Sequence, residues 1–366
     1  MIGTLPGLAR MPHAGGPPIR PFVRVIAVID GANPSFDYYL APRLAACGGL
    51  EVRTAMLRTG PGQLPAAQFD DALVLFCRYA TPRWLAQLER LGGRVAGVAL
   101  FLDDDLAALS RDPGVPRLAR LRYWWHGTCH WKRLGRLAGT LLVSTPALAQ
   151  RYRQANPRVL KPIGGSAGAD GDSSADGPFV VAYHGSSIHR AEHRWLQAVA
   201  AQVVKRSAGR VRFEVSAHGG IARSWRRCPG VVVGPWLPWP QYRAQADRRV
   251  DLLLAPLLPS AANAVRSWTR RIDAARLAAA LLVSDVSVYR VAPEERALGM
   301  YAPLCPEVWT ETILEHAAQP KRCRLLAALN RRWLAAEAML SPAEALCVKQ
   351  PATARWQLLL APATPG

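Results

Sequence analysis

With 366 residues, half of them hydrophobic and 20% charged, the chain is long enough for two globular domains, and its composition excludes a disordered protein. Seven cysteines without a Cys-x-x-Cys pair favour neither a disulfide framework nor a zinc ribbon. The formal net charge of +20 favours anionic partners such as nucleotides, phospholipid surfaces or nucleic acid. Because most of this charge comes from arginines scattered along the chain, and no nucleic-acid-binding motif is present, we expect no nucleic-acid partner.

The N-terminal region has prolines and glycines where a signal peptide would have its apolar core. We therefore expect a disordered lead-in over residues 1–20. No apolar run reaches the ~18 residues that are needed to cross a bilayer. These two features together predict a cytoplasmic protein.

Apolar runs then alternate with helical stretches. This alternation predicts a parallel sheet covered on both faces, and we expect a first Rossmann-like domain over residues 21–158. Its expected strands are 23–29, 72–77, 95–102 and 139–144, with a helix over 82–91.

Residues 159–178 contain the clearest linker of the chain, rich in Gly, Ser, Ala and Asp. The α/β pattern then restarts, which predicts a second Rossmann-like domain over 179–324. A C-terminal helix and tail over 325–366 are expected to return across the cleft between the two domains. In such folds the ligand lies at the carboxyl ends of the strands. The expected strands of the second domain are 179–183, 211–216, 231–233, 251–254 and 281–284.

The segment 251–284 is the most informative part of the sequence. If a helix begins near Asn263, then Asn263, Arg266, Arg270 and Asp273 share an arc of about 80° at 100° per residue. Arginines near a helix start can hold a diphosphate, and a carboxylate one turn further along can accept the hydroxyls of a ribose. An ordinary solvated helix face with an Arg–Asp pair explains the spacing equally well.

This segment resembles the donor-binding motif of family 4 (group 1) glycosyltransferases of the capsule and O-antigen type, which are bacterial enzymes with the GT-B fold. In that motif an aspartate and an apolar strand lead to Ala-Pro-Leu, followed by Asn-x-x-Lys-Ser-x-x-Lys-x-x-Glu and a Gly-x-Pro turn. The matching residues here are Asp251, Ala255, Pro256, Leu257, Asn263, Arg266, Ser267, Arg270, Asp273 and Ser284.

The resemblance implies an α/β protein whose two Rossmann-like domains face each other across a cleft. It implies that Arg270 binds the donor phosphates and Asp273 the ribose. We expect Arg266 and Arg270 to be the catalytic residues because positive groups stabilise the leaving diphosphate. The expected donor-binding residues are Gly185, Ser186, Asn263, Ser267 and Asp273.

The motif also departs from the family pattern. Arginine replaces lysine at 266 and 270, and Asp273 replaces a longer glutamate. Ala278 and Ala280 replace the usual glycine and proline, and Val265 stands where the wider family has a first glutamate.

Weaker matches follow the family in the same order along the chain. Tyr183, Gly185, Ser186 and His189 resemble its Gly-Tyr-x-Gly-Ser-x-x-His stretch. Such a Gly-Ser turn can offer N–H groups to a phosphate, or Ser186 or Ser187 can simply cap the next helix. For Trp236 and Tyr242, which lie in another weakly matching segment, we expect core packing.

Three carboxylates, Asp103, Asp104 and Asp105, follow the strand expected at 95–102 and resemble the acidic strand end of the family. Such a group can bind a divalent metal, but the family needs none, so we expect no metal site. We expect one carboxylate to cap the following helix and another to face the acceptor.

Aromatic and basic residues cluster over 123–131. His126 and His130 have a zinc-compatible spacing, but no further ligand is visible, so packing or acceptor contact is favoured. Together with the basic residues, the aromatic side chains could also rest on an anionic membrane surface.

These patterns predict a glycosyltransferase (hexosyltransferase type). It would move a sugar from a nucleotide diphosphate sugar to a saccharide or lipid-linked hydroxyl acceptor, in surface polysaccharide or glycan biosynthesis. The resemblance implies retention of the anomeric configuration and no metal or other cofactor. Three alternatives are open: a non-catalytic GT-B binding module, a nucleotide-sugar epimerase or phosphorylase of the same fold, and a basic nucleic-acid binder. We expect a cytoplasmic location, with peripheral contact at the inner face of a membrane.

Overall fold

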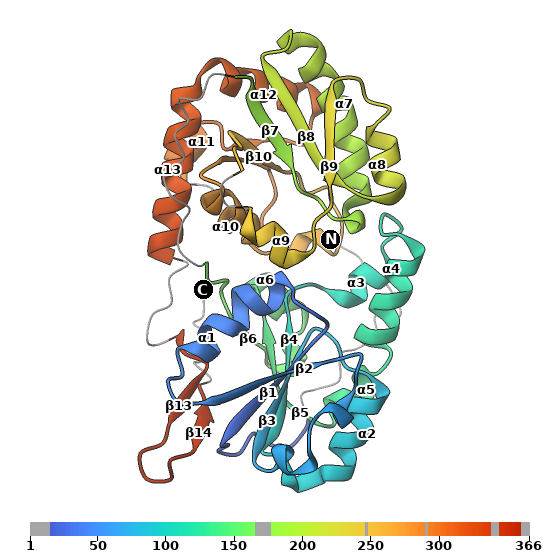
Figure 1. The fold of residues 1–366 in the computed structure, drawn as a ribbon, viewed down its shortest axis with the longest axis vertical. Helices are drawn as coiled ribbons and strands as arrows, with labels where there is room; N and C mark the ends of the chain where they lie inside the picture. The colour runs from blue at the N-terminus through green and yellow to red at the C-terminus, as the bar shows by residue number, and fades with distance from the viewer. Residues whose placement is uncertain (1–14, 165–176, 246–247, 290–291, 338–343, 360–366) are drawn as a thin grey trace. The chain divides into compact units, whose positions relative to one another are not determined.

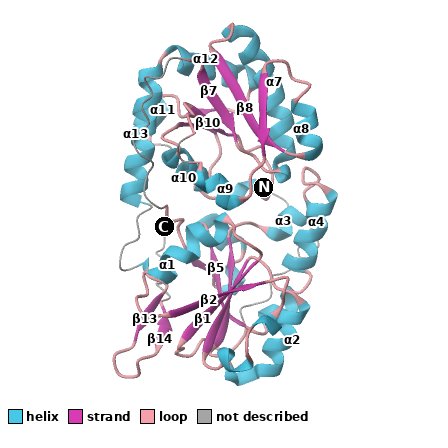
Figure 2. Ribbon diagram, in the orientation of Figure 1, coloured by secondary structure: helices cyan, strands magenta, loops and turns pink. Residues whose placement is uncertain are grey.

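The computed structural model describes residues 15–164, 177–245, 248–289, 292–337 and 344–359. The described chain divides into two compact units, and each has its own six-stranded parallel sheet (Figures 1 and 2). Unit 1 contains most residues up to Ile163 together with the C-terminal segment, and unit 2 contains Pro113–Arg117 and residues between Gly164 and Met339. The expected lead-in at 1–14 and the core of the expected linker at 165–176 lie outside the described residues.

Unit 1 has the strand order β2-β1-β3-β4-β5-β6. The edge strand β2 lies on one side of β1, and the later strands extend the sheet on the other side. All of its neighbouring strands pair in parallel. The strands are β1 (Arg24–Ile29), β2 (Glu51–Met56), β3 (Ala72–Cys77), β4 (Gly97–Leu102), β5 (Ala138–Val143) and β6 (Arg158–Val159).

The four strands expected in this unit are confirmed because each is a continuous apolar run that is buried in the sheet. The edge strand β2 was not expected, since most of its side chains are exposed and its sequence lacks an apolar run. The expected helix at 82–91 is confirmed as α2 (Pro82–Leu91). Besides short 3-10 turns, the other helices of this region are η1 (Phe36–Leu40), α1 (Ala41–Ala45), α3 (Leu106–Arg111), α4 (Arg117–Arg122), η5 (Tyr123–Thr128), α5 (Trp131–Gly135) and α6 (Pro146–Arg151).

Unit 2 has the strand order β12-β11-β10-β7-β8-β9, and its neighbouring strands are again all parallel. The five strands expected from sequence are present within a residue or two. The strands are β7 (Phe179–Tyr183), β8 (Val211–Ala217), β9 (Val231–Pro235), β10 (Leu252–Ala255), β11 (Ala280–Ser284) and β12 (Tyr301–Ala302).

The helices of unit 2 supply the rest of its core. In α7 (Arg190–Ser207) the buried face contains Leu196, Val199 and Val203, and the helix ends at Ala208, which is left-handed. The remaining helices are α8 (Gly219–Trp225), α9 (Trp239–Ala244), α10 (Thr269–Arg276), α11 (Pro293–Ala297), α12 (Pro306–Ala318) and α13 (Pro320–Glu337).

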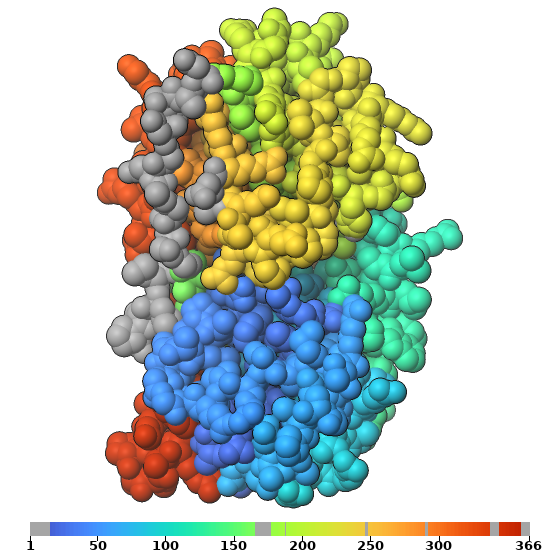
Figure 3. All heavy atoms as spheres, in the orientation of Figure 1, coloured from blue at the N-terminus to red at the C-terminus, as the bar shows by residue number. Residues whose placement is uncertain are grey.

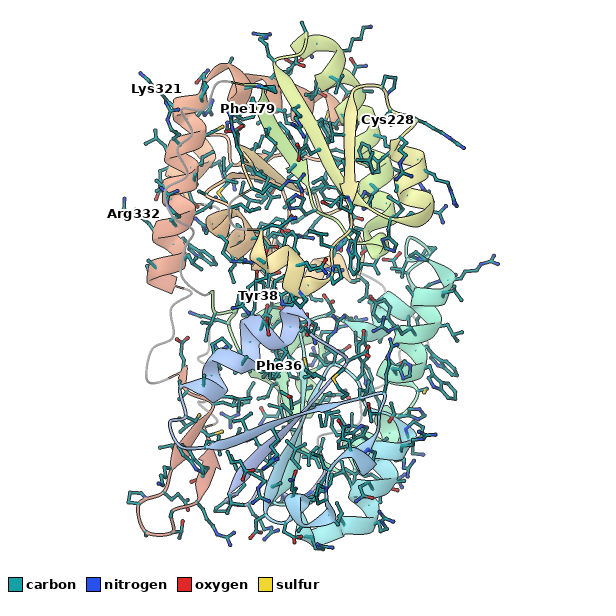
Figure 4. The ribbon with its side chains drawn as sticks, in the orientation of Figure 1. Phe36, Tyr38, Phe179, Cys228, Lys321 and Arg332 are labelled. Atoms are coloured by element: carbon teal, nitrogen blue, oxygen red, sulfur yellow. The ribbon has the colours of Figure 1, made fainter. Side chains whose placement is uncertain are left out.

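The C-terminal helix α13 begins at Pro320, five residues before the expected start, and packs on α10 and β11 within unit 2. Its buried residues include Leu326 and Leu334, whereas Lys321 and Arg332 point away from the unit (Figure 4). The tail after Gln350 was expected to be loose. Its described residues instead include β14 (Trp356–Leu358), which pairs with β13 (Cys347–Lys349) in an antiparallel hairpin of unit 1.

Within the described ranges, no helix combines the length and apolar character needed to span a bilayer.

Candidate functional site

The candidate donor site lies where β7 and β10 end. These strands are parallel neighbours at the centre of the second sheet (Figure 1), so the turns that follow them leave from the same edge. After β7 the chain continues through His184 and Gly185 to α7, and after β10 it continues through residues 256–268 to α10. The residues expected to bind the donor come from these two connections.

The turn after β7 depends on a close approach of backbone to an aromatic ring. A Cβ atom added to Gly185 would lie 2.5 Å from the Tyr183 ring, so only glycine fits there. His193, in the first half of α7, contacts the Gly185 carbonyl oxygen with its Nε2 at 3.1 Å. Its Nδ1 accepts a hydrogen bond of 2.9 Å from the Trp225 indole. Nε2 must therefore carry the proton that His193 donates to Gly185.

Burial lowers the pKa of His193 to about 4, which keeps the ring neutral at neutral pH. The neutral ring can satisfy both contacts, one as donor and one as acceptor. His193 thus fixes the turn from the protein interior, and it was not identified from sequence.

The alternative that Ser186 or Ser187 caps the next helix is wrong, because the N-cap residue of α7 is His189. A short 3-10 turn, η7 (Ser187–His189), separates Ser186 from α7, and the Ser186 side chain makes no capping hydrogen bond. The Gly-Ser turn therefore does not open directly into the long helix.

The start of the motif helix was also predicted wrongly. Residues Asn263–Val265 form a 3-10 turn, η8, Arg266 is extended, and α10 begins only at Thr269. Local side-chain bonds explain the difference: the Asn263 N–H donates to Ser260 Oγ at 3.1 Å, and its amide Nδ2 donates to the Leu258 carbonyl at 2.8 Å. Such bonds compete with helix formation. The expected common arc of four residues therefore holds only for Arg270 and Asp273.

Arg270 joins the two connections. Its Nη2 donates a hydrogen bond of 2.6 Å to the His184 carbonyl oxygen, and its Nη1 contacts Asp273 Oδ2 at 3.1 Å. A guanidinium has five N–H donors, so three remain without a hydrogen bond to the described residues. Arg270 is half-buried and Asp273 is buried. The Arg–Asp pair that the sequence suggested is therefore present, and the remaining N–H donors of Arg270 could still bind an anion.

Arg266 lies in the same electrostatic environment. Burial raises the pKa of Tyr183 above its usual range, the charge of Glu192 adds to this, and Arg270 and Arg266 both oppose it. Burial also raises the pKa of Tyr289 to about 12, although the charges of Arg270 and Arg266 act to lower it. Two guanidinium groups and two phenols therefore lie close together. Ser267 is half-buried beside them.

Glu192 is the main residue that sequence reasoning missed. From the first turn of α7 its Oε1 accepts a hydrogen bond of 2.7 Å from Asn263 Nδ2, and its Oε2 lies 3.8 Å from His189 Nδ1. Burial alone would raise its pKa, but the contacts with His189 and Asn263 outweigh burial and lower it to about 2. The signal in the sequence is a glutamate three residues after the motif histidine.

His184 and Tyr242 complete the described cluster. His184 Nδ1 and the Tyr242 hydroxyl are 3.2 Å apart, and the rings meet edge to face. Burial, with smaller effects of Arg270 and Arg248, lowers the pKa of His184 to about 3, so the imidazole is neutral. Tyr242 thus has a polar contact that the expected core packing did not include. Core packing is wrong for Trp236, which is exposed.

In unit 1, the three expected acceptor-side carboxylates are engaged by neighbouring groups. Asp103 and Asp104 contact Arg78 at 3.1 and 3.0 Å, and the Ser35 hydroxyl donates to Asp103 Oδ2 at 2.5 Å. Arg78 has a φ of +72°, a left-handed conformation that is strained for any residue with a side chain.

Asp105 is fully buried and caps α3, as expected for one of the three carboxylates. It accepts hydrogen bonds from Ala108 N at 2.9 Å and from the Tyr152 hydroxyl at 2.7 Å, and it pairs with Arg151 at 3.0 Å. Asp105 therefore holds the local structure together rather than facing a ligand.

The aromatic-histidine cluster separates into two sets. Tyr123 and Trp131 are buried, whereas Trp124 and Trp125 are exposed. The His126 ring packs against Tyr79 and the His130 ring against Trp125. Across the described ranges no group of three or more His, Cys, Asp or Glu side chains is placed to hold a metal ion.

No protein-family model matches the chain, and no curated protein sequence is significantly similar to it. Among solved structures, sucrose-phosphate synthase from Thermosynechococcus elongatus has a TM-score of 0.56 at 13% identity, over 86% of this chain and 95% of that one. A study of glycosyl transfer with retention by trehalose-6-phosphate synthase gave a structure with a TM-score of 0.50 at 11% identity, over 85% and 95% of the two chains.

TarM has a TM-score of 0.53 at 12% identity over 79% of this chain, and the chain spans only 56% of TarM. A mutant of TarM from S. aureus, solved with fondaparinux, alpha-GlcNAc-glycerol and UDP, has a TM-score of 0.51 at 10% identity. At these identities the likeness shows the fold. Two parallel six-stranded sheets with flanking helices and these neighbours show that the chain has the two-domain, Rossmann-like GT-B fold.

Proposed function

We propose that the chain is a glycosyltransferase that moves a sugar from a nucleotide diphosphate sugar to a hydroxyl acceptor. The observation that carries the proposal is the position of Arg270, which contacts the end of β7 and keeps three N–H donors beside Arg266. Preorganised positive groups stabilise the charge that develops on a leaving diphosphate. The neighbours of the same fold include a TarM structure with UDP and alpha-GlcNAc-glycerol, which supports a nucleotide sugar donor and a saccharide acceptor.

In this proposal Arg266 and Arg270 bind the diphosphate, Asp273 accepts the ribose hydroxyls, and Asn263, Ser267, Gly185 and Ser186 line the donor site. Membership of the family 4 glycosyltransferases, retention of configuration and independence of metal belong to the same proposal. So do a lipid-linked or saccharide acceptor in surface polysaccharide synthesis and a cytoplasmic location at the inner face of a membrane.

The test is a reaction of the purified chain with a panel of UDP-, GDP- and dTDP-sugars and a mixture of simple glycoside acceptors. We expect release of one nucleoside diphosphate and formation of a glycoside, both lost in Arg270→Ala and unaffected by EDTA. Proton NMR of the product gives its anomeric configuration, which should match that of the donor.

Nucleotide binding without any product would favour the non-catalytic binding module, and conversion of the donor without an acceptor would favour an epimerase. Either result would overturn the transferase proposal. Val265 stands where the wider family has a glutamate, and the lack of this carboxylate favours the binding module.

A further inference from the structure

Helix α4 has no buried residue, which is unusual for a helix of a compact unit. Leu118 is 82% exposed and Leu121 is 56% exposed, and in the following η5 Trp124 and Trp125 are 48% and 47% exposed. Four large apolar side chains thus face solvent within eight residues. Together with Lys132 and Arg136 they form what we call the basic aromatic surface. The α4 segment lies in the teal region at the right margin of Figure 3.

The opposite side of this segment is fixed to its unit. Tyr123, Gly127 and Thr128 are buried, and a Cβ atom on Gly127 would lie 3.0 Å from the Leu106 side chain of α3. The spacing of Leu118, Leu121 and Trp125 is that of one face of a helix. One face therefore packs on α3, and the other presents leucines and tryptophans outward.

The charge of the region is entirely positive. Residues 113–136 contain six arginines and lysines and no aspartate or glutamate. Arg122 pairs with Asp30, and Arg133 pairs with Glu89. Lys132 and Arg136 are exposed, and no ion pair joins them to the part of the chain that the structure describes.

We propose that the basic aromatic surface docks the chain on an anionic lipid bilayer. Leu118, Leu121 and the two tryptophans would enter the interfacial region, where tryptophan is favoured, while the basic side chains contact headgroup phosphates. The aromatic cluster recognised in the sequence contributes only its two exposed tryptophans, and α4 supplies the leucines.

A bilayer fits this surface better than a protein or a nucleic acid does. A protein partner would have to place acidic groups opposite the cations at fixed positions, since residues 113–136 contain six arginines and lysines and no Asp or Glu, whereas an anionic bilayer offers negative charge over its whole surface. Nucleic acids offer phosphates but no layer in which exposed leucines would be buried. An anionic bilayer supplies both.

The test is co-sedimentation of the full chain with vesicles of phosphatidylcholine alone or mixed with phosphatidylglycerol, without any nucleotide. We expect binding to the anionic vesicles only, and weaker binding at high salt. Two variants should each weaken binding by about tenfold or more: Trp124→Ala with Trp125→Ala, and Lys132→Glu with Arg136→Glu.

Two controls match these variants: Trp236→Ala removes another exposed tryptophan, and Arg223→Glu reverses another exposed arginine, both in unit 2. Neither should change vesicle binding. The proposal is overturned if the native chain stays in solution with anionic vesicles, or if the surface variants and the controls bind equally well. Since the assay needs neither donor nor turnover, its failure would leave the proposed transfer reaction standing and would remove only the membrane location from the proposed function.

Discussion

Arg270 donates a hydrogen bond of 2.6 Å to the carbonyl oxygen of His184, 86 residues earlier in the chain. This bond ties helix α10 to the end of strand β7, so the guanidinium belongs to both connections of the candidate donor site. Asp273 holds the other side of the same guanidinium. A ligand diphosphate at Arg270 would therefore meet a group whose orientation is set before binding, which lowers the entropic cost of binding.

Replacing Ala278 by glycine should stabilise the chain. Ala278 has a φ of +50°, a left-handed conformation that costs a non-glycine residue about 1 kcal/mol, and the related motif has glycine here. We expect Ala278→Gly to raise the free energy of unfolding by about 0.5–1 kcal/mol in urea. Ala279→Gly, at a buried neighbour without a positive φ, should lower it. Equal losses in both variants would show that the conformation at 278 is not left-handed.

His193 should make stability depend on pH. Its pKa is lowered from 6.5 to about 4 by burial, so the unfolded chain binds the proton more readily than the folded chain. Stability is then fully present above pH 6.5 and falls as the pH decreases towards 4, by up to about 1.4 kcal/mol per pH unit.

Unfolding in urea at several pH values checks this. The difference in the free energy of unfolding between the native chain and His193→Gln should shrink from pH 7 to pH 4. Exposed His218, changed to glutamine, serves as the control for the loss of a solvent-exposed imidazole. A constant difference for His193 would contradict the buried, neutral imidazole.

Glu192→Gln should destabilise the chain by about 1–3 kcal/mol at pH 7, because it removes a charged acceptor from the buried Asn263 amide. The pKa of Glu192 is lowered from 4.5 to about 2, so its contribution is present above pH 4.5 and is lost as the pH falls towards 2. The two proteins should therefore converge in stability in acid. The exposed Glu294→Gln change should cost little, and an equally small cost at Glu192 would rule out the proposed anchor.

Arg78 should contribute to the stability of the folded chain rather than to substrate binding. Arg78→Ala leaves the Asp103 and Asp104 carboxylates without their cation, and we expect a loss of about 3–5 kcal/mol. Arg78→Gly should cost about 1 kcal/mol less because glycine adopts a φ of +72° without strain. Adding Asp103→Asn and Asp104→Asn to Arg78→Ala should recover part of the loss. Unchanged stability of Arg78→Ala in urea would instead leave the acidic residues free for an acceptor.

Strands were predictable wherever burial on both faces required a continuous apolar run, as in β3, β7 and β11. The edge strand β2 and the two-residue strands β6 and β12 give no such run and were missed. Within the site, Arg270 and Asp273 could be paired from sequence because they are three residues apart on one helix.

The other site contacts depend on tertiary structure. Glu192 reaches Asn263 across 71 residues, and Arg270 reaches His184 across 86, and no local periodicity encodes either contact. The start of α10 was misplaced for a related reason, because Ser260, Leu258 and Glu192 all bond Asn263 outside a helix.

The most direct test of the central claim is thermal unfolding of the native chain with UDP, GDP, ADP, CMP and dTDP, beside Arg270→Ala and the control Arg276→Ala on the same helix. A nucleotide at 100 times its Kd stabilises the folded state by about 2.7 kcal/mol, which should raise the Tm by about 5 °C or more. We predict that one nucleoside diphosphate raises the Tm of the native chain and of Arg276→Ala but not of Arg270→Ala. No shift with any nucleotide, or an equal shift in all three proteins, would contradict a donor site at Arg270.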